Sequence, residues 1–266
     1  MEIKTKEEIR IIAEGGKILS DIVKKLGEMV RPGIETKELN KVAEGLVLKS
    51  GGRCSFKGYD GFPACLCTSI NEEIVHAAPS ERKLKEGDII SLDLGIFYKG
   101  FHSDMAITVP VGKISLEAKR LIEVTRKSLE IGMEKIKPGN RFGDISRVIQ
   151  KYVEGQACLP AGRGFGVVRE LCGHGIGREL HEDPQILNSV STSKETVDKV
   201  KYQGESSIKL KEGMVFCIEP MITAGDWRIK KSPDGFGYQT RDNSLSAHFE
   251  HTIAVTKSGY QVLTKL

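Results

Sequence analysis

The chain repeats one pattern of residues in its first and second halves. Residues 84–87 and 210–213 both read Leu-Lys-Glu-Gly, and each tetrapeptide precedes an apolar run rich in β-branched residues. In this alignment Asp93 corresponds to Glu219. The strand that follows also matches, because residues 102–104 (His-Ser-Asp) correspond to residues 248–250 (His-Phe-Glu). An earlier His-x-x-Pro sequence at residues 76–79 corresponds to residues 181–184. These matches occur in the same order in both halves, which predicts an internal duplication.

Helix signals support the same division. Thr5 and Glu8 have the spacing of a capping box, and the turn at residues 31–33 ends the apolar periodicity that follows them. Residues 137–139 repeat the Lys/Arg-Pro-Gly turn, again between two amphipathic stretches. We therefore expect half-repeats near residues 1–113 and 114–266 that form one catalytic domain over residues 1–266. The predicted class is α+β (α/β), with two pseudo-symmetric halves, a central antiparallel sheet and outer helices.

Composition excludes several classes of protein. The chain has 266 residues, of which 39% are hydrophobic, so it can form a sizeable core. No apolar run approaches the roughly 18 residues of a membrane span, and the charged first ten residues do not resemble a signal sequence. The net charge of +4 is mild and its basic residues are scattered, which predicts no direct binding to nucleic acid. The six cysteines form no Cys-x-x-Cys pair, so we expect buried thiols in a reducing cytoplasm.

Four acids lie in apolar strand sequences. Asp93 and Asp104 flank a short turn, and alternation along the strands predicts that both face the same side of a hairpin. Glu219 and Glu250 repeat the arrangement in the second half. Each acid alone is most simply explained as the partner of a surface lysine or arginine, but no basic residue lies within the four strand cores. Two divalent cations would balance four buried carboxylates, and Mn, Fe, Co or Zn suits such a site.

The glycine-flanked His174, in residues 173–177 (Gly-His-Gly-Ile-Gly), is the expected nitrogen ligand of this metal pair. His76 and His181, the duplicated histidines, are expected to line the cleft and donate hydrogen bonds to the substrate. The remaining histidines lie next to ligand strands and are assigned supporting or structural roles: His102, His248 and His251.

These motifs together resemble the type I methionine aminopeptidases. The resemblance rests on the Asp93–Asp104 spacing, residues 173–178 (Gly-His-Gly-Ile-Gly-Arg), residues 218–221 (Ile-Glu-Pro-Met) and residues 249–252 (Phe-Glu-His-Thr). It implies the pita-bread fold and removal of the initiator methionine from nascent proteins and peptides when the second residue is small.

The resemblance also implies roles for individual residues. The metal ligands would be Asp93, Asp104, His174, Glu219 and Glu250. The catalytic residues would be His76, His181 and Glu219, with Glu219 as the proton shuttle for an attacking metal-activated hydroxide. The substrate-binding residues would be Tyr59, Phe62, Cys67, His76, His181 and Trp227. Departures from the family pattern change the pocket's shape: Phe56, Val75, Ala77 and Leu180.

The expected partners are nascent polypeptide N-termini and short peptides beginning with Met, with possible ribosome proximity, no membrane and a monomeric state. The expected location is cytoplasmic. Two alternatives stay open: a Xaa-Pro aminopeptidase or prolidase of the same fold, and a non-catalytic relative that binds ribosomes or RNA. The polar segment 188–207 is expected to be a surface excursion.

Overall fold

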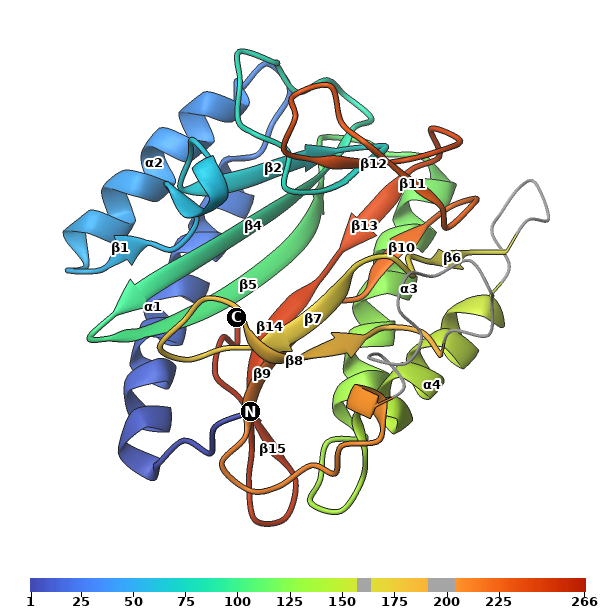
Figure 1. Ribbon diagram of the computed structural model, residues 1–266. Coiled ribbons are helices and arrows are strands. Elements are labelled where there is room, and N and C mark those ends of the chain that lie inside the picture. The colour runs from blue at the N-terminus through green and yellow to red at the C-terminus, as the bar shows by residue number, and fades with distance from the viewer. Residues whose placement is uncertain (157–163, 191–203) are drawn as a thin grey trace.

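Two pairs of helices lie behind a curved antiparallel sheet (Figure 1). The structure is a computed structural model and describes residues 1–156, 164–190 and 204–266. The helices are α1 (Lys6–Met29), α2 (Thr36–Lys49), α3 (Leu116–Met133) and α4 (Phe142–Glu154), with a short 3-10 turn at Tyr59–Gly61. One pair comes from each half of the sequence, as the duplication predicts. The assignment of both halves to one domain remains a prediction.

The largest sheet joins strands from both halves. Its order is β1 (Arg53–Cys54), β4 (Ile89–Tyr98), β5 (Phe101–Pro110), β14 (Glu250–Val255), β9 (Val215–Ile218), β7 (Cys172–Gly175) and β8 (Glu182–Leu187). β2 (Leu66–Ile70) also pairs with β4, and β15 (Tyr260–Val262) pairs with β14. The join between β5 and β14 brings the first half of the chain against the second.

Two three-stranded sheets complete the fold. One contains β13 (Ser246–His248), β10 (Met221–Thr223) and β6 (Gly166–Val167). The other contains β11 (Ile229–Lys231), β12 (Tyr238–Thr240) and β3 (Glu73–Val75). The first of these sheets belongs to the second half of the chain, whereas the second sheet pairs β3 of the first half with β12 of the second half.

Helix α1 begins with the predicted capping box, in which the Thr5 hydroxyl accepts from the Glu8 amide and the Glu8 carboxylate accepts from the Thr5 amide. Its apolar face packs on β4 and β5, which buries Leu19 and Leu26 completely. Gly16 permits a close approach to the C-terminal segment, because a Cβ at this position would lie 2.2 Å from the Leu263 carbonyl oxygen. No helix in the described part of the chain is long and apolar enough to cross a membrane.

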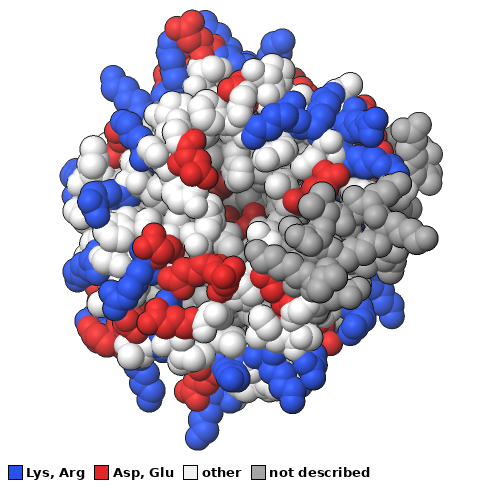
Figure 2. All heavy atoms as spheres, in the orientation of Figure 1, with Lys and Arg blue, Asp and Glu red and all other residues white. Residues whose placement is uncertain are grey.

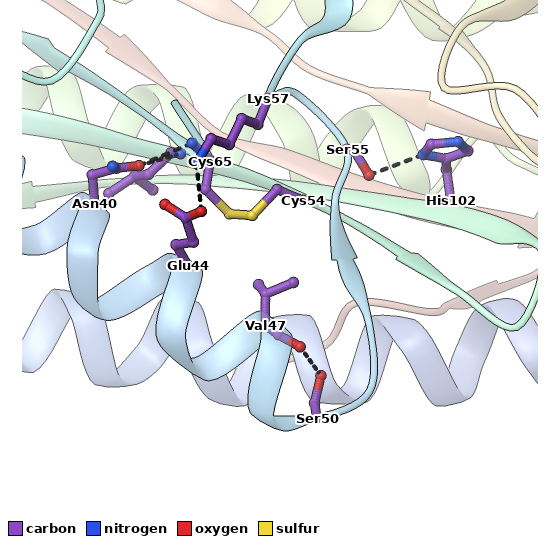
Figure 3. The surroundings of a disulfide bond; sticks show 10 residues. Asn40, Glu44, Val47, Ser50, Cys54, Ser55, Lys57, Cys65 and His102 are labelled. Atoms are coloured by element: carbon purple, nitrogen blue, oxygen red, sulfur yellow. Dashed lines mark hydrogen bonds and ion pairs between the residues drawn. A yellow bond between two sulfur atoms is a disulfide. The ribbon is translucent and has the colours of Figure 1, made fainter. Parts of the chain in front are cut away.

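The expectation that all cysteines are free thiols is wrong for two of them. Cys54 and Cys65 form a disulfide (Figure 3). The tertiary reason is that β1 and β2 pair with the same edge of β4, so the end of one strand meets the start of the other. The spacing of 11 residues carries no local signal for this pairing. Cys67 and Cys217 are buried free thiols, and Cys158 lies outside the described residues.

Candidate metal centre and substrate cavity

Three of the four predicted carboxylates project from adjacent strands onto one face of the sheet. Asp93 on β4 pairs with Ala106 on β5, and Ala106 pairs in turn with Glu250 on β14. Directly paired residues point to the same side of an antiparallel sheet. The small Ala106 side chain therefore lies between two carboxylates and leaves space above itself. Asp104 pairs with Gly95, two positions along the same strands, so the predicted shared face of Asp93 and Asp104 is confirmed.

Asp104 is held by the strand beside it. Its amide donates to the Thr252 hydroxyl over 2.9 Å, and that hydroxyl donates to the Asp104 carbonyl oxygen over 2.8 Å. The Met105 amide donates to Asp104 Oδ1 over 2.9 Å. These contacts restrict the carboxylate because both its backbone and one oxygen have partners.

Glu219, directly after β9, and His174 on β7 complete the group. His174 Nε2 lies 3.7 Å from Glu219 Oε1 and 4.0 Å from Glu250 Oε1. The His174 Nδ1 lies 2.9 Å from the Gly175 carbonyl oxygen, which leaves Nε2 directed at the carboxylates.

The glycines beside His174 admit neighbouring strands. A Cβ at Gly173 would lie 2.3 Å from the Cys217 carbonyl oxygen, and one at Gly175 would lie 2.6 Å from that of Asp183. Their absence of a side chain therefore brings β9 and β8 against the strand that carries the imidazole. Gly173 and Gly175 therefore serve strand packing.

Burial dominates the electrostatics of the group. All four carboxylates and His174 are buried, and burial raises the pKa of Asp93, Glu219 and Glu250 well above their ordinary values. Burial also raises the pKa of Asp104 to about 7. Repulsion among neighbouring carboxylates adds to the rise for the first three. Burial lowers the pKa of His174 to about 3, so its imidazole is neutral and suited to ligation.

The donor set fits divalent cations. Asp93 Oδ1 and Glu250 Oε1 are buried and have no hydrogen-bond partner among the described residues. Within the same ranges, no lysine or arginine forms an ion pair with any of the four acids. One oxygen from each of Asp93, Asp104 and Glu250 lies within 4.8 Å of the others. Carboxylate oxygens with one imidazole are the donors that Mn, Fe, Co and Zn accept.

The group lines a cavity of about 450 Å³. Figure 2 shows a hollow at the centre of this face with acidic atoms visible in its depth. The cavity wall also includes three of the residues that the family resemblance implied: Tyr59, Phe62 and Cys67. Phe56 and Leu180, two of the departures from the family pattern, also line the cavity. They contribute one aromatic and one branched apolar side chain to its wall.

Trp227 does not line this cavity within the described residues. Its ring instead stacks with the guanidinium groups of Arg169 and Arg228, 4.5 and 5.0 Å from the ring centroid. Phe236 lines the cavity instead, and its ring lies edge to face with that of Phe62 at 5.6 Å between ring centroids. Phe236 follows the turn sequence Ser-Pro-Asp-Gly at residues 232–235, which is typical of a loop but does not reveal that the loop contacts the site.

The duplicated histidines both line the cavity beside the carboxylates. His181 Nδ1 lies 2.8 Å from the Tyr59 hydroxyl, and its ring is 4.4 Å from that of His174. His76 has a positive φ of 59° and its ring meets the edge of Tyr238. The structure thus brings both histidines to the wall that a bound peptide would contact.

The expected surface excursion at 188–207 is wrong for its first residues. Asn188 and Ser189 are buried, and the Asn188 amide donates to the Glu219 carbonyl oxygen over 3.0 Å. Asn188 therefore supports the strand end that carries Glu219, a role that a polar stretch of sequence does not reveal. Residues 191–203 lie outside the described residues.

Comparison with known proteins agrees with this geometry. The model of Metallopeptidase family M24 matches residues 10–257. "Methionine aminopeptidase 1" of Bacillus subtilis is 44% identical over 263 residues, which cover 99% of this chain and 98% of that protein. A crystal structure of methionine aminopeptidase from Thermotoga maritima has a TM-score of 0.89 and 38% identity, with full coverage of both chains.

A prolidase from Pyrococcus furiosus shares the fold, with a TM-score of 0.74 and 24% identity, but this chain covers only 65% of it. The predicted pita-bread architecture and the resemblance noted in the sequence are both confirmed by these matches. The chain belongs to metallopeptidase family M24.

Proposed function

We propose that this chain is a methionine aminopeptidase, which hydrolyses the peptide bond after an N-terminal methionine. The observation that carries the proposal is one cavity whose wall combines four buried carboxylates and an imidazole with an apolar cluster that includes Phe62, Cys67 and Phe236. The apolar cluster suits an unbranched thioether side chain. The similarity to methionine aminopeptidases over the full chain supports the same activity.

The residues that would hold two divalent ions are Asp93, Asp104, His174, Glu219 and Glu250. When bound, such ions supply an activated water near neutral pH and polarise the scissile carbonyl group. We propose that the ions are Co, Mn, Fe or Zn, since all four bind carboxylate and imidazole donors. The free α-amino group of the substrate would bind beside these residues, which restricts cleavage to the first residue.

The chain's own residues perform the remaining steps. Glu219 takes a proton from the attacking water and passes it to the leaving amine. His181 Nδ1 lies 2.8 Å from the Tyr59 hydroxyl. In the tautomer with its proton on Nε2, Nδ1 accepts from this hydroxyl and Nε2–H can donate to the developing oxyanion. His76, on the same wall, holds the scissile peptide nitrogen or the developing charge.

Substrate range and setting follow from the proposed activity. The proposal includes a small second residue in the substrate, as the family resemblance implies. Nascent chains with N-terminal Met are the natural substrates, so the proposal includes a cytoplasmic location, proximity to ribosomes and action as a monomer. The prolidase alternative is less favoured because it matches over a smaller share of the relative, and a non-catalytic relative has no need of a complete ligand set.

The test compares Glu219→Ala with the exposed, matched Glu28→Ala on α1. Hydrolysis of Met-Ala-Ser should fall by at least about 100-fold in the first variant and stay at the parent rate in the second. Chelation of the parent should abolish hydrolysis, and stepwise return of Mn²⁺ or Co²⁺ should restore it. An Ala-Pro-Ser peptide tests the prolidase alternative. Full activity of Glu219→Ala, indifference to chelator, or faster cleavage of the Pro peptide would contradict the proposal.

A further inference from the structure

His248 is a buried histidine whose ring has no hydrogen-bond partner. The side chain is 1% exposed, and within the described ranges neither Nδ1 nor Nε2 forms a hydrogen bond. Unpaired polar atoms are costly in a protein interior, because they lose their contacts with water. The other two supporting histidines differ, since His102 pairs with Ser55 and His251 pairs with Thr264. The exception at His248 therefore calls for a partner that forms in the working enzyme.

The carboxylate of Glu219 lies beside the ring. His248 Nε2 lies 3.5 Å from Glu219 Oε2, whereas His174 Nε2 lies 3.7 Å from the other oxygen, Oε1. The two imidazoles thus face different oxygens of one carboxylate. His174 lines the cavity, but His248 is not among the lining residues and lies behind Glu219.

The position of His248 is set by its backbone. Its amide donates to the Thr108 hydroxyl over 2.8 Å, and that hydroxyl donates to the His248 carbonyl oxygen over 2.9 Å. His248 also pairs with Met221 on β10, two residues beyond Glu219. Because this strand end is restrained, the His248 ring has a fixed position beside the Glu219 carboxylate.

We propose that His248 is a positioning residue for Glu219. Its Nε2–H donates to Glu219 Oε2, so Oε1 remains directed toward His174 and the cavity. The hydrogen bond restricts rotation of the carboxylate and orients it for metal binding and proton transfer. The inference rests on the proposed function, because Glu219 needs a fixed orientation only if it is a ligand and proton carrier. Groups that orient a metal ligand from behind affect both metal affinity and rate.

A different arrangement is chemically conceivable at the same place. One ligand atom from each of Glu219, His248 and Glu250 lies within 4.8 Å of the others, so His248 could supply a second nitrogen directly to a metal. We favour positioning because the ring lies outside the cavity lining and faces the oxygen that points away from His174. Direct ligation is therefore an outcome that the experiment must distinguish.

The experiment uses the full chain, freed of metal, with His248→Leu and His248→Gln. Leu removes the donor, whereas the Gln amide can donate to the same oxygen. Calorimetric titration with Mn²⁺ should show an affinity about 10- to 100-fold weaker for His248→Leu and within about threefold of the parent for His248→Gln. With Met-Ala-Ser, His248→Leu should lower kcat more than it raises KM, and Gln should restore kcat. Thermal melts of the metal-free forms identify any variant that fails to fold.

Each other outcome has a defined meaning. Equal Mn²⁺ affinity and kcat for the parent and His248→Leu would overturn the inference. If Gln fails as Leu does, and the visible spectrum of the Co²⁺-loaded parent changes in both variants, His248 is a direct ligand and positioning is wrong. Should His248→Leu not fold, His248→Ala, which also lacks the donor, replaces it in the same measurements. A parent that binds no Mn²⁺ contradicts the proposed function itself, and this is measured before any variant.

Discussion

Asp93 and Glu250 lie in one row across the sheet, and Ala106 is paired with both of them on the strand between. The first acid belongs to the first half of the chain and the second acid to the second half. Continuing the pairing of β14 with β9 places Glu219 next in the same row, because His251 already pairs with Ile218. The centre is therefore a product of strand register across the join between the halves.

The row makes the size of residue 106 decisive. In Ala106→Leu the added carbons fill the space between the two carboxylates, so Mn²⁺ affinity should fall by more than about tenfold, as overpacking costs about 1–3 kcal/mol. Ala106→Gly is the matched control, because it leaves the space open and should bind Mn²⁺ like the parent. Calorimetric titration measures both, and circular dichroism checks the fold. Parent-like Mn²⁺ binding by Ala106→Leu would show that the row does not form the site.

The aromatic wall of the pocket gives a second prediction. Phe236→Ala removes apolar surface from the part of the wall proposed to receive the methionine side chain. Full burial of such a side chain contributes about 1.5–3 kcal/mol. We expect kcat/KM for Met-Ala-Ser to fall by about 10- to 100-fold, mainly through KM. Trp227→Ala should keep KM near that of the parent, since Trp227 stacks on arginines away from the cavity. A higher KM for Trp227→Ala together with a parent-like KM for Phe236→Ala would instead indicate that Trp227 lines the pocket.

Stability of the metal-free protein should depend on pH through Asp104. Burial raises its pKa from an ordinary 3.8 to about 7, so the folded state holds this proton more tightly than the unfolded chain does. Its contribution is complete below about pH 4 and is lost as the pH rises to about 7. Relative to Asp104→Asn, the parent should therefore lose up to about 1.4 kcal/mol of unfolding free energy per pH unit in this window. Urea unfolding in chelator measures this difference, and a pH-independent difference would contradict it.

The disulfide closes the loop that carries part of the cavity wall. Residues 55–64 lie between Cys54 and Cys65 and include Tyr59 and Phe62. Loop-closure entropy for a separation of 11 residues predicts that the double variant Cys54→Ser/Cys65→Ser loses about 3 kcal/mol of unfolding free energy. We also expect a higher KM for Met-Ala-Ser, because the loop is then less restrained.

Treatment of the parent with a dithiol should reproduce the loss in stability, and the serine double variant should not respond further. Thermal melts with and without the reductant compare the two proteins. Identical melting of the parent and the double variant, together with unchanged KM, would remove any structural role for this bond.

Much of the metal centre was predictable because acids in apolar strands are costly without a cation. Asp93, Asp104, Glu219 and Glu250 stand out for this reason, and their places in the repeat pair them two by two. Alternation along a strand was enough to place the first two on one face. The helix pairs were predictable from capping and periodicity, as the Thr5 capping box illustrates.

Other parts depend on contacts between segments far apart in the chain. Phe236 rather than Trp227 lines the pocket, and Asn188 supports Glu219, because loop paths decide both. The Cys54–Cys65 disulfide likewise depends on two strands meeting along one edge of β4. No periodicity or spacing encodes these encounters.

The sequence by itself determined which side chains carry the chemistry and that they occur in two related halves, since local patterns and the cost of buried charge act residue by residue. Only the tertiary structure decided how the halves meet. The pairing of β5 with β14 sets the row from Asp93 through Ala106 to Glu250, and the placement of β13 sets His248 behind Glu219. Register and packing between distant strands are properties of the folded chain, because they are set by all contacting segments together.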